Sequence, residues 1–458
     1  MASAPAARGT WGSRVGFILA AAGSAVGLGN IWRFPTSVGR GGGAAFVLIY
    51  LACVFVIAIP IMLAELAIGR RTQRNPVGAF TVLAPGSAWK YLGFLGVLTG
   101  LAILSYYCVV AGWTLGFFAK TIAGSFTNIA SEDVVRQAFL GMIANPFSAL
   151  GLHALFMILT MWVVVGGVRH GIERASKILM PILLVILLLL VVRSVTLPGA
   201  EAGLDFYLRP DFSKVNAGVV MNALGQAFFS LSLGMGAMIT YGSYLCRKED
   251  LFSSAVWVSL TDAGIAVLAG LAIFPALFTI STVEPEAGPG LIFMVLPNIF
   301  DKIPFGQFFG AGFFLLLAIA ALTSSISLLE VVVAYFVDEK AWRRRNAVLA
   351  FGGVAFVLGV PSALGHGAVG WLSSLPGLGL SFLELVDVVF GNFSLTIGAL
   401  LISLFVVWRW GLASAREELA FRFLPQWSNV SWGFLLRFLC PVAIGAILVN
   451  LVLEQLAR

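Results

Sequence analysis

The chain has little charge and few of the residues that carry out chemistry. Only 11% of its 458 residues are charged, against about 25% in a soluble globular protein, and 60% are hydrophobic. The four cysteines and three histidines are scattered, without C-x-x-C or H-E-x-x-H spacing, and no Walker A or G-x-S-x-G motif occurs. These absences argue against a disulfide framework, a zinc site, a metalloprotease, an ATPase and a serine hydrolase. We therefore do not expect an enzyme.

Long apolar runs fill most of the chain. They predict a polytopic all-α membrane protein, because a β-barrel would show short alternating segments instead. About eleven spans are expected, near residues 14–37, 42–69, 88–122, 147–167, 173–195, 217–245, 253–281, 306–337, 346–364, 381–408 and 432–455. Between these spans, residues 125–145 and 198–214 are expected to be loops, and 285–304 contains an apolar piece that is too short to cross and could dip back as a hairpin.

The basic residues predict the orientation in the bilayer. The net charge is +7, and most of the 28 Lys and Arg residues fall in segments that are inside if the N-terminus is cytoplasmic. The positive-inside rule then places the N-terminus inside and, after eleven spans, the C-terminus outside. This basicity reflects topology, so the lipid bilayer is the expected partner and nucleic acid is not.

The first apolar run, within residues 11–35, is interrupted. From Val15 to Leu28 it is apolar or small apart from Ser24, but the sequence GLGN at residues 27–30 interrupts it, and Arg33 comes shortly after. Freed backbone groups at membrane depth persist only where they line a cavity or bind a ligand. The alternative is a secretory signal peptide, which is disfavoured because no clean A-x-A site follows and the chain stays apolar. A broken helix that holds something small and charged is the preferred interpretation.

A second glycine-rich interruption lies at residues 225–236, in the sixth span. The two breaks occupy corresponding positions in two five-helix halves, 11–195 and 217–408, and 432–455 is an additional span. Because five is odd, the second half runs with inverted topology. Such paired interruptions point to the midplane site of a secondary transporter. Glycine packing between helices could explain either break alone, but not both in register.

The motifs at these breaks carry a family resemblance. They are GNIWRFP at 29–35, a glycine-rich run before Phe46, LAELAIGR around Glu65, Tyr106-Tyr107, WTLG from Trp113, SLSLGMG at 230–236 and LTSS at 322–325. The chain resembles the neurotransmitter:sodium symporter family, especially its bacterial hydrophobic amino-acid symporters of the leucine-transporter type. The resemblance covers residues 11 to about 407. It implies the 5+5 inverted-repeat fold with broken helices 1 and 6, for which the family's leucine transporter is a standard example.

The resemblance implies a substrate site at the two breaks. A zwitterionic amino acid needs donors for its carboxylate, which the Leu28 and Gly29 amides and the Tyr107 hydroxyl could supply. Its amine needs acceptors, implied at the carbonyls of Ala25, Phe229 and Ser230. The implied side-chain pocket is formed by Ile103, Phe229, Ser232, Met235, Ser324 and Leu328.

Two sodium sites are implied in the same way. The first uses Ala25, Asn30, Ser230, Asp262 and the substrate carboxylate; the second uses Gly23, Val26, Ala320, Thr323 and Ser324. From the residues alone, the hydroxyls of Thr323 and Ser324 could equally bond back to their own helix, as is common in membrane segments.

Embedded charges predict gates, since a charge at the centre of a bilayer costs roughly 2.5–3.5 kcal/mol on insertion scales. Arg33 and Asp387 are the expected outer pair, and Arg8 and Asp338 the inner pair. Glu65 is expected to accept hydrogen bonds from the backbone at the second break. The roles of Glu330 and Glu384 stay open between interfacial snorkelling, vestibule lining and function.

The resulting hypothesis is a sodium-coupled symporter in the bacterial inner membrane that imports aliphatic and aromatic L-amino acids by alternating access, without an obligatory protein partner. In some relatives a chloride balances the sodium charge, and in others a glutamate at the position of Ala266. Here Tyr50, Gln226 and Ser230 would be the chloride neighbours, but Asp262 supplies a carboxylate directly, which predicts chloride independence. The alternative is that Asp262 is protonated and only hydrogen-bonded, as an asparagine would be. A ligand-gated sodium channel and a transporter-like amino-acid receptor are the alternatives.

Overall fold

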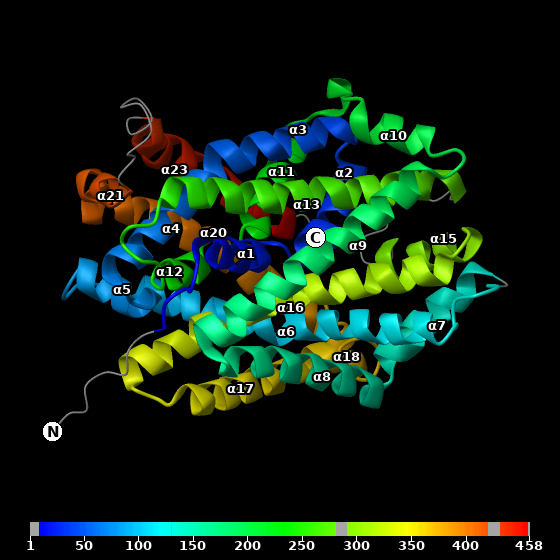
Figure 1. The fold of residues 1–458 in the computed structure, drawn as a ribbon, viewed down its shortest axis with the longest axis horizontal. Helices are drawn as coiled ribbons and strands as arrows, with labels where there is room; N and C mark the ends of the chain where they lie inside the picture. Colours follow the sequence, from blue (N-terminus) through cyan, green and yellow to red (C-terminus); the bar gives the residue numbers. More distant parts are fainter. Residues whose placement is uncertain (1–8, 130, 281–290, 420–430, 457–458) are drawn as a thin grey trace.

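The computed structural model describes residues 9–129, 131–280, 291–419 and 431–456. In this part of the chain all regular elements are helical (Figure 1). In chain order they are α1 Arg14–Ala25, η1 Gly29–Arg33, α2 Phe34–Arg40, α3 Ala44–Cys53, η2 Val54–Ala58, α4 Ile59–Thr72, α5 Pro76–Leu83, α6 Lys90–Ile122, α7 Glu132–Ala144, α8 Pro146–Val165, η3 Val168–Glu173, α9 Arg174–Val195, α10 Glu201–Leu208, η4 Phe212–Lys214, α11 Ala217–Ser230, α12 Ala237–Gly242, α13 Leu251–Ile280, η5 Leu291–Val295, α15 Leu296–Lys302, α16 Gly306–Lys340, α17 Arg344–Leu364, α18 Gly370–Ser373, α19 Phe382–Val386, η6 Asp387–Ser394, α20 Leu395–Leu404, η7 Phe405–Gly411, α21 Leu412–Leu419, η8 Leu435–Leu439 and α23 Cys440–Leu456.

Nine helices in the described ranges are long and apolar enough to cross a bilayer. A tenth span is formed by the helices Arg14–Ala25 and Gly29–Arg40, between which the helix direction bends by 54°. The expected sixth span is divided into α11 and α12, each too short to cross alone, and together they would complete eleven. The prediction of a polytopic all-α membrane protein is confirmed.

The longest helices, α6 and α16, lie side by side through the middle of the molecule (Figure 1). Both pack against α8 and α17, so that these four helices form one contiguous group. The broken first span sits on this group, because α1 contacts α16 as well as α9 and α13. The second break joins α11, which packs on α3, to α12, which packs on α4. The two breaks therefore meet between the four-helix group and the remaining helices.

Both breaks follow from local backbone chemistry. α1 ends at Ala25 because the backbone dihedral angles of Val26 are extended, and the chain becomes helical again at Gly29 in the π-helical turn η1. Between α11 and α12 the chain adopts left-handed φ angles at Ser232, Gly234 and Gly236. A side chain at Gly234 would also collide with the carbonyl of Leu395, so glycine is needed there for both reasons. Ser232 is the exception, a serine in a conformation that L residues seldom adopt.

Two segments expected as loops are helical. Residues 125–145 contain α7, whose Val135, Phe139, Met142 and Ile143 recur at helical spacing and are buried. Residues 198–214 contain α10, which packs on α13 through Gly203 and Tyr207. Their polar flanks hid short amphipathic helices that are too short to span a bilayer.

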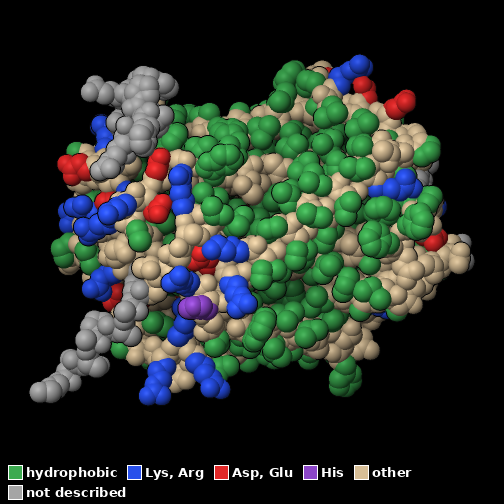
Figure 2. Space-filling model, viewed as in Figure 1, with side chains coloured by type: hydrophobic (Ala, Val, Ile, Leu, Met, Phe, Trp, Pro, Cys, Tyr) green, Lys and Arg blue, Asp and Glu red, His purple; other side chains and the backbone are tan. Residues whose placement is uncertain are grey.

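The surface separates by side-chain type. Figure 2 shows hydrophobic side chains over much of the visible face, and Lys and Arg gathered at the end where Figure 1 places α5 and the start of α17. Large apolar side chains such as Trp162 and Val442 are exposed in the structure. A broad apolar belt of this kind is the expected boundary with lipid.

Candidate transport site

A cavity of about 40 Å³ lies where the two breaks meet α6 and α16. It is lined by Ala25, Gly27, Gly29, Ile103, Tyr107, Phe229, Ser230, Ser232, Met235, Ser324, Leu328 and Leu395. The structure thus gathers around one space ten of the eleven residues predicted to contact substrate. The eleventh, Leu28, does not line the cavity, but its backbone amide donates to Tyr107, which does. The sequence interpretation did not include Gly27 or Leu395.

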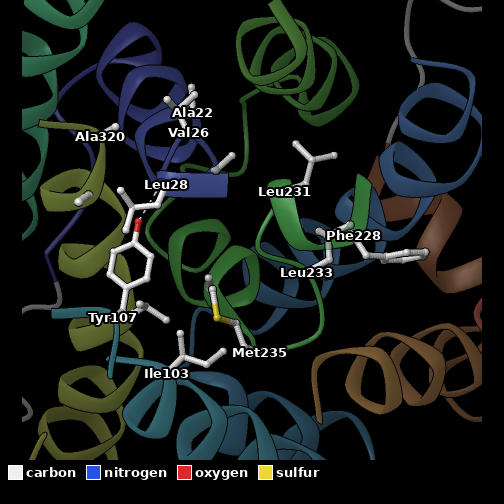
Figure 3. Packing of buried hydrophobic residues seen from close by; sticks show 14 of the residues in the cluster. Ala22, Val26, Leu28, Ile103, Tyr107, Phe228, Leu231, Leu233, Met235 and Ala320 are labelled. Atoms are coloured by element: carbon white, nitrogen blue, oxygen red, sulfur yellow. Dashed lines mark hydrogen bonds between the residues drawn. The ribbon is translucent and has the colours of Figure 1, made fainter. Parts of the chain in front are cut away.

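The Leu28 amide and the Tyr107 hydroxyl, which were predicted to bind the substrate carboxylate, lie within hydrogen-bond distance of each other beside the cavity. Leu28 N donates to Tyr107 Oη at 3.2 Å, and Figure 3 shows Tyr107 reaching from α6 to the break in the first span. Gly27 makes this approach possible, since a Cβ there would lie 2.6 Å from Ser324 Oγ and 2.7 Å from Tyr107 Oη. A substrate carboxylate in this position would find one amide donor and one hydroxyl donor in a buried setting.

The opposite wall of the cavity is apolar. Figure 3 shows Ile103 and Met235 close together beside Tyr107, and Leu328 and the ring of Phe229 complete the lining. No charged side chain lines this cavity among the residues described. Burying a charged substrate side chain here would leave its charge unpaired, which is costly.

The predicted first sodium site is a buried hydrogen-bonded cluster around Asp262. One carboxylate oxygen accepts from Asn30 Nδ2 at 2.7 Å, and the other accepts from Ser230 Oγ at 2.7 Å. All three side chains are at most 1% exposed, although they come from η1, α11 and α13. Three elements distant in sequence therefore place a carboxylate, a hydroxyl and an amide together beside the cavity.

The Asn30 amide has the opposite orientation to the one a sodium ligand needs. Its Nδ2 faces Asp262 and Ser230, while its Oδ1 accepts from Gly27 N at 3.1 Å. Sodium coordination by Oδ1 would require a half-turn of the amide, with loss of the bond from Gly27. The donor set still suits a hard cation, because a carboxylate, a hydroxyl and an amide oxygen are available within one cluster.

The expected chloride neighbours adjoin this cluster. Tyr50 Oη lies 3.4 Å from both Ser230 Oγ and Asp262 Oδ2. Gln226 donates to the Gly29 carbonyl at 3.0 Å, and its side-chain oxygen is buried without a hydrogen-bond partner among the described residues. The Asp262 carboxylate therefore already accepts the hydroxyl protons that an anion at this position would use.

The predicted second sodium site is a group of five oxygens between α1 and α16. Ser324 Oγ lies 3.5 Å from the Gly23 carbonyl oxygen and 3.1 Å from that of Val26. Thr323 Oγ1 lies 3.5 Å from the Val26 oxygen and 3.0 Å from that of Ala320. Oxygens that surround a cation at about 2.3–2.6 Å have separations of this order. Thr323 also bonds back to its own helix, so both roles considered for its hydroxyl are compatible with the structure.

Arg33 and Asp387, the expected outer pair, face a second cavity of about 270 Å³ on the other side of Phe229. They do not form an ion pair within 4.0 Å in this conformation. Asp387 accepts from the Tyr106 hydroxyl at 2.6 Å, and Arg33 donates to Asn392 Oδ1 at 3.4 Å. The gate role of this pair stays a prediction.

The expected inner pair is only partly visible, because Arg8 lies outside the described residues. Asp338 accepts from the backbone amide of Asn75 at 3.2 Å. The nearby start of α1 is held by Trp11, whose indole donates to the Tyr241 carbonyl at 2.9 Å and whose ring packs edge-on against Tyr241. The contacts of Trp11 hold the residues before α1 against α12.

The comparisons with known proteins decide the family. The model of the sodium:neurotransmitter symporter family matches residues 8–132 and 136–457. The chain belongs to this family. The uncharacterized sodium-dependent transporter YhdH of Bacillus subtilis is 40% identical over 96% of this chain and 97% of its own length. An uncharacterized sodium-dependent transporter of Haemophilus influenzae is 37% identical over 97% of this chain and 98% of its own.

Among solved structures, the crystal structure of MhsT in complex with L-phenylalanine matches with a TM-score of 0.88. The sequences are 46% identical, and the match covers 97% of this chain and all of that one. The present protein is therefore a multi-pass, sodium-dependent transporter with the fold of this family and is not an enzyme. The predicted family resemblance is confirmed.

The structure assigns contacts to the other carboxylates considered for this symporter, of which Glu65 and Glu330 are buried and Glu384 is exposed. Glu65 accepts from the Gly234 amide at 2.7 Å, which confirms the expected structural role at the second break. Glu330 pairs with Arg344 and accepts from the Tyr244 hydroxyl at 2.7 Å, so it is a buried ion-pair residue. Glu384 caps the first turn of α19 and lines the cavity shared by the outer pair.

Glu173 is a buried carboxylate to which sequence analysis gave no role. Glu173, on η3, accepts from Gly12 N at 2.6 Å, from Ser13 Oγ at 3.0 Å and from Lys177 Nζ at 2.6 Å. It is 2% exposed and anchors the residues that begin α1. The i,i+4 spacing of Glu173 and Lys177 was the only local signal, and it does not reveal the contact with the N-terminal segment.

Proposed function

We propose that this sodium-dependent transporter imports hydrophobic L-amino acids, aliphatic and aromatic, by alternating access around the cavity between the two breaks. The observation that carries the proposal is the composition of this cavity. Backbone amides and the Tyr107 hydroxyl lie on one side, and Ile103, Met235 and Leu328 on the other. An amino acid with an apolar side chain matches this division into polar and apolar halves.

The substrate class is supported by the flexible side of the cavity. Met235 lies between two glycines and has an unbranched side chain that can repack around ligands of different size. We therefore propose a range from Val and Leu to Phe and Trp. The similarity to MhsT, whose crystal structure contains L-phenylalanine, supports an aromatic substrate.

Two sodium ions are proposed for each transport cycle. The first would be held by Ala25, Asn30, Ser230 and Asp262 together with the substrate carboxylate, and the second by the five oxygens between α1 and α16. A shared carboxylate couples the first ion to the substrate, and this coupling is reciprocal. We further propose that Asp262 replaces chloride as the balancing negative charge.

The proposed location is the inner membrane of a bacterium, with the N-terminus in the cytoplasm and the C-terminus outside. The cluster of Lys and Arg at one end of the molecule supports this orientation (Figure 2). The proposed repeats are residues 11–195 and 217–408. The breaks at α1/η1 and α11/α12 occupy corresponding places in them.

Counterflow in proteoliposomes tests the function. Vesicles preloaded with unlabelled phenylalanine should accumulate radiolabelled phenylalanine from a sodium buffer, and should not do so in a potassium buffer. A channel would let the label equilibrate without accumulation, and a receptor would bind it without any transport. Thr323→Val should abolish sodium-driven counterflow. Thr261→Val is the matched control, because its hydroxyl bonds only to its own helix, at the Trp257 carbonyl.

A further inference from the structure

The larger cavity, on the other side of Phe229 from the substrate cavity, contains Arg33 and Asp387 at separate positions of its lining. It is lined by Arg33, Met221, Asn222, Gly225, Phe228, Phe229, Glu384, Asp387, Val388, Gly391, Asn392, Leu395, Thr396, Ile447, Asn450, Leu451, Glu454 and Gln455. Phe229 and Leu395 also line the substrate cavity, so these two side chains are the partition between the two spaces. Whatever moves this partition controls access to the substrate cavity.

Each outer charge is hydrogen-bonded to a neutral side chain. The Tyr106 hydroxyl holds Asp387, and the Asn392 amide oxygen holds Arg33. The Arg33 guanidinium also lies over the Phe229 ring, 4.5 Å from its centroid, which adds a cation–π contact to the partition. In this conformation the Arg33 guanidinium lies at Asn392 and forms no ion pair with Asp387, so formation of that pair requires the guanidinium to move.

The backbone of η6 brings the two holding sites together. Its π-helical turns place Asn392 five residues after Asp387, and Asn392 Nδ2 lies 3.4 Å from the Asp387 carbonyl oxygen. Gly391 leaves room for the carboxylate, since a Cβ there would collide with Asp387 Oδ1 and lie 2.8 Å from Tyr106 Oη. Short π-helical segments are frequent at functional sites, and here the segment serves both charges.

We propose that Asn392 is a positioning residue of the outer gate, which keeps Arg33 away from Asp387 and so stabilises the open vestibule. Tyr106 acts in the same direction on Asp387. Closing the gate exchanges these two hydrogen bonds for the ion pair. A hydrogen bond to a charged group and a partly exposed ion pair are similar in strength, so removing either bond shifts the balance toward closure. This inference rests on the proposed transport function.

A cysteine at the partition tests the gate without any substrate. Leu395→Cys in a Cys246→Ser background provides the reporter, because Cys246 is the exposed native cysteine and Cys53, Cys108 and Cys440 are buried. The labelling rate with a membrane-impermeant thiol reagent is measured in sodium buffer from the outer side. We expect Asn392→Ala to label about tenfold more slowly than the reporter parent, a shift of about 1.4 kcal/mol.

Three further variants define the result. Tyr106→Phe should also slow labelling, and it carries the test if Asn392→Ala does not fold. Asn392→Asp keeps an acceptor for Arg33 and should retain the parental rate, which a purely structural role would not explain. Asn222→Ala is the matched control, because Asn222 lines the same cavity but forms no hydrogen bond with either outer charge in the described structure.

Unchanged or faster labelling in both Asn392→Ala and Tyr106→Phe would overturn the inference, as would a slowed rate in Asn222→Ala. Sodium-dependent phenylalanine binding by the parent is measured in parallel. Slowed labelling without any amino-acid binding would refute the proposed function and support the gate. Normal binding with unchanged labelling would refute the gate alone.

Discussion

Replacing Asp262 with asparagine should change the ion requirement of this symporter. In the present structure the Asp262 carboxylate accepts hydrogen bonds from Asn30 and Ser230, and Tyr50 Oη lies 3.4 Å away. A carboxylate is an acceptor only, whereas an asparagine amide offers one oxygen and two N–H donors. In Asp262→Asn the hydroxyls of Ser230 and Tyr50 can therefore donate to an anion instead.

The size of the effect follows from the distances. An anion bound by the hydroxyls of Tyr50 and Ser230 would lie roughly 4 Å from the carboxylate of Asp262. Two like unit charges about 4 Å apart repel by roughly 4 kcal/mol at an effective dielectric constant of about 20. Since about 1.4 kcal/mol is a tenfold change, the carboxylate should weaken chloride binding by roughly three orders of magnitude.

Uptake of phenylalanine into proteoliposomes, with chloride replaced by gluconate, measures this requirement. The wild-type protein should transport equally well in both media. Asp262→Asn should be active only with chloride, or inactive. Thr261→Val, at the neighbouring position of the same helix, should match the wild type. Wild-type uptake that collapses without chloride, or full activity of Asp262→Asn in gluconate, would refute the reasoning.

Three other predictions follow from the same contacts. Asn30→Ala should weaken sodium and phenylalanine binding together by at least about tenfold, because a hydrogen bond to a charged group contributes roughly 1.5–3 kcal/mol. Isothermal titration at several sodium concentrations measures both affinities, and an amino-acid affinity independent of sodium would contradict the shared ligand. Gly27→Ala should abolish phenylalanine binding while the protein still folds, since the added methyl group would lie 2.6 Å from Ser324 Oγ. A scintillation-proximity assay measures the binding and a melting curve the folding; retained affinity would disprove the requirement for glycine at this position. Glu330→Gln should destabilise the protein, by less than the roughly 3–5 kcal/mol of a fully buried pair, because it leaves the partly buried Arg344 without its counter-ion. Thermal unfolding in detergent should show a lower midpoint that the double variant with Arg344→Met partly restores, and an unchanged midpoint would argue against the pair.

The sequence alone determined the spans and the positions of the two breaks. Both depend on local properties, since hydropathy over about 20 residues decides whether a segment crosses a bilayer. Glycine lowers the cost of leaving helical angles, as at Gly234. The role of Glu65 was also predictable, because a buried carboxylate near a break in backbone hydrogen bonding has few other partners.

The family pattern, and not the residue chemistry by itself, assigned the substrate and sodium residues. A threonine and a serine on one helix, such as Thr323 and Ser324, are compatible with simple back-bonding. Only the tertiary structure brings their hydroxyls to the carbonyls of Gly23 and Val26, about 300 residues earlier in the chain. The orientation of the Asn30 amide was likewise decided by its neighbours in space.

Other features were accessible only in three dimensions. Glu173 binds the start of α1 across 161 residues, and Glu330 pairs with Arg344 at the end of another helix. Asn392 looked like any polar residue of an apolar span, yet it holds Arg33 from 359 residues away. The physical reason is the same in each case. Helical periodicity and hydropathy describe a segment relative to lipid, whereas a buried polar group is satisfied by whichever partner the packing of distant helices brings within hydrogen-bond distance.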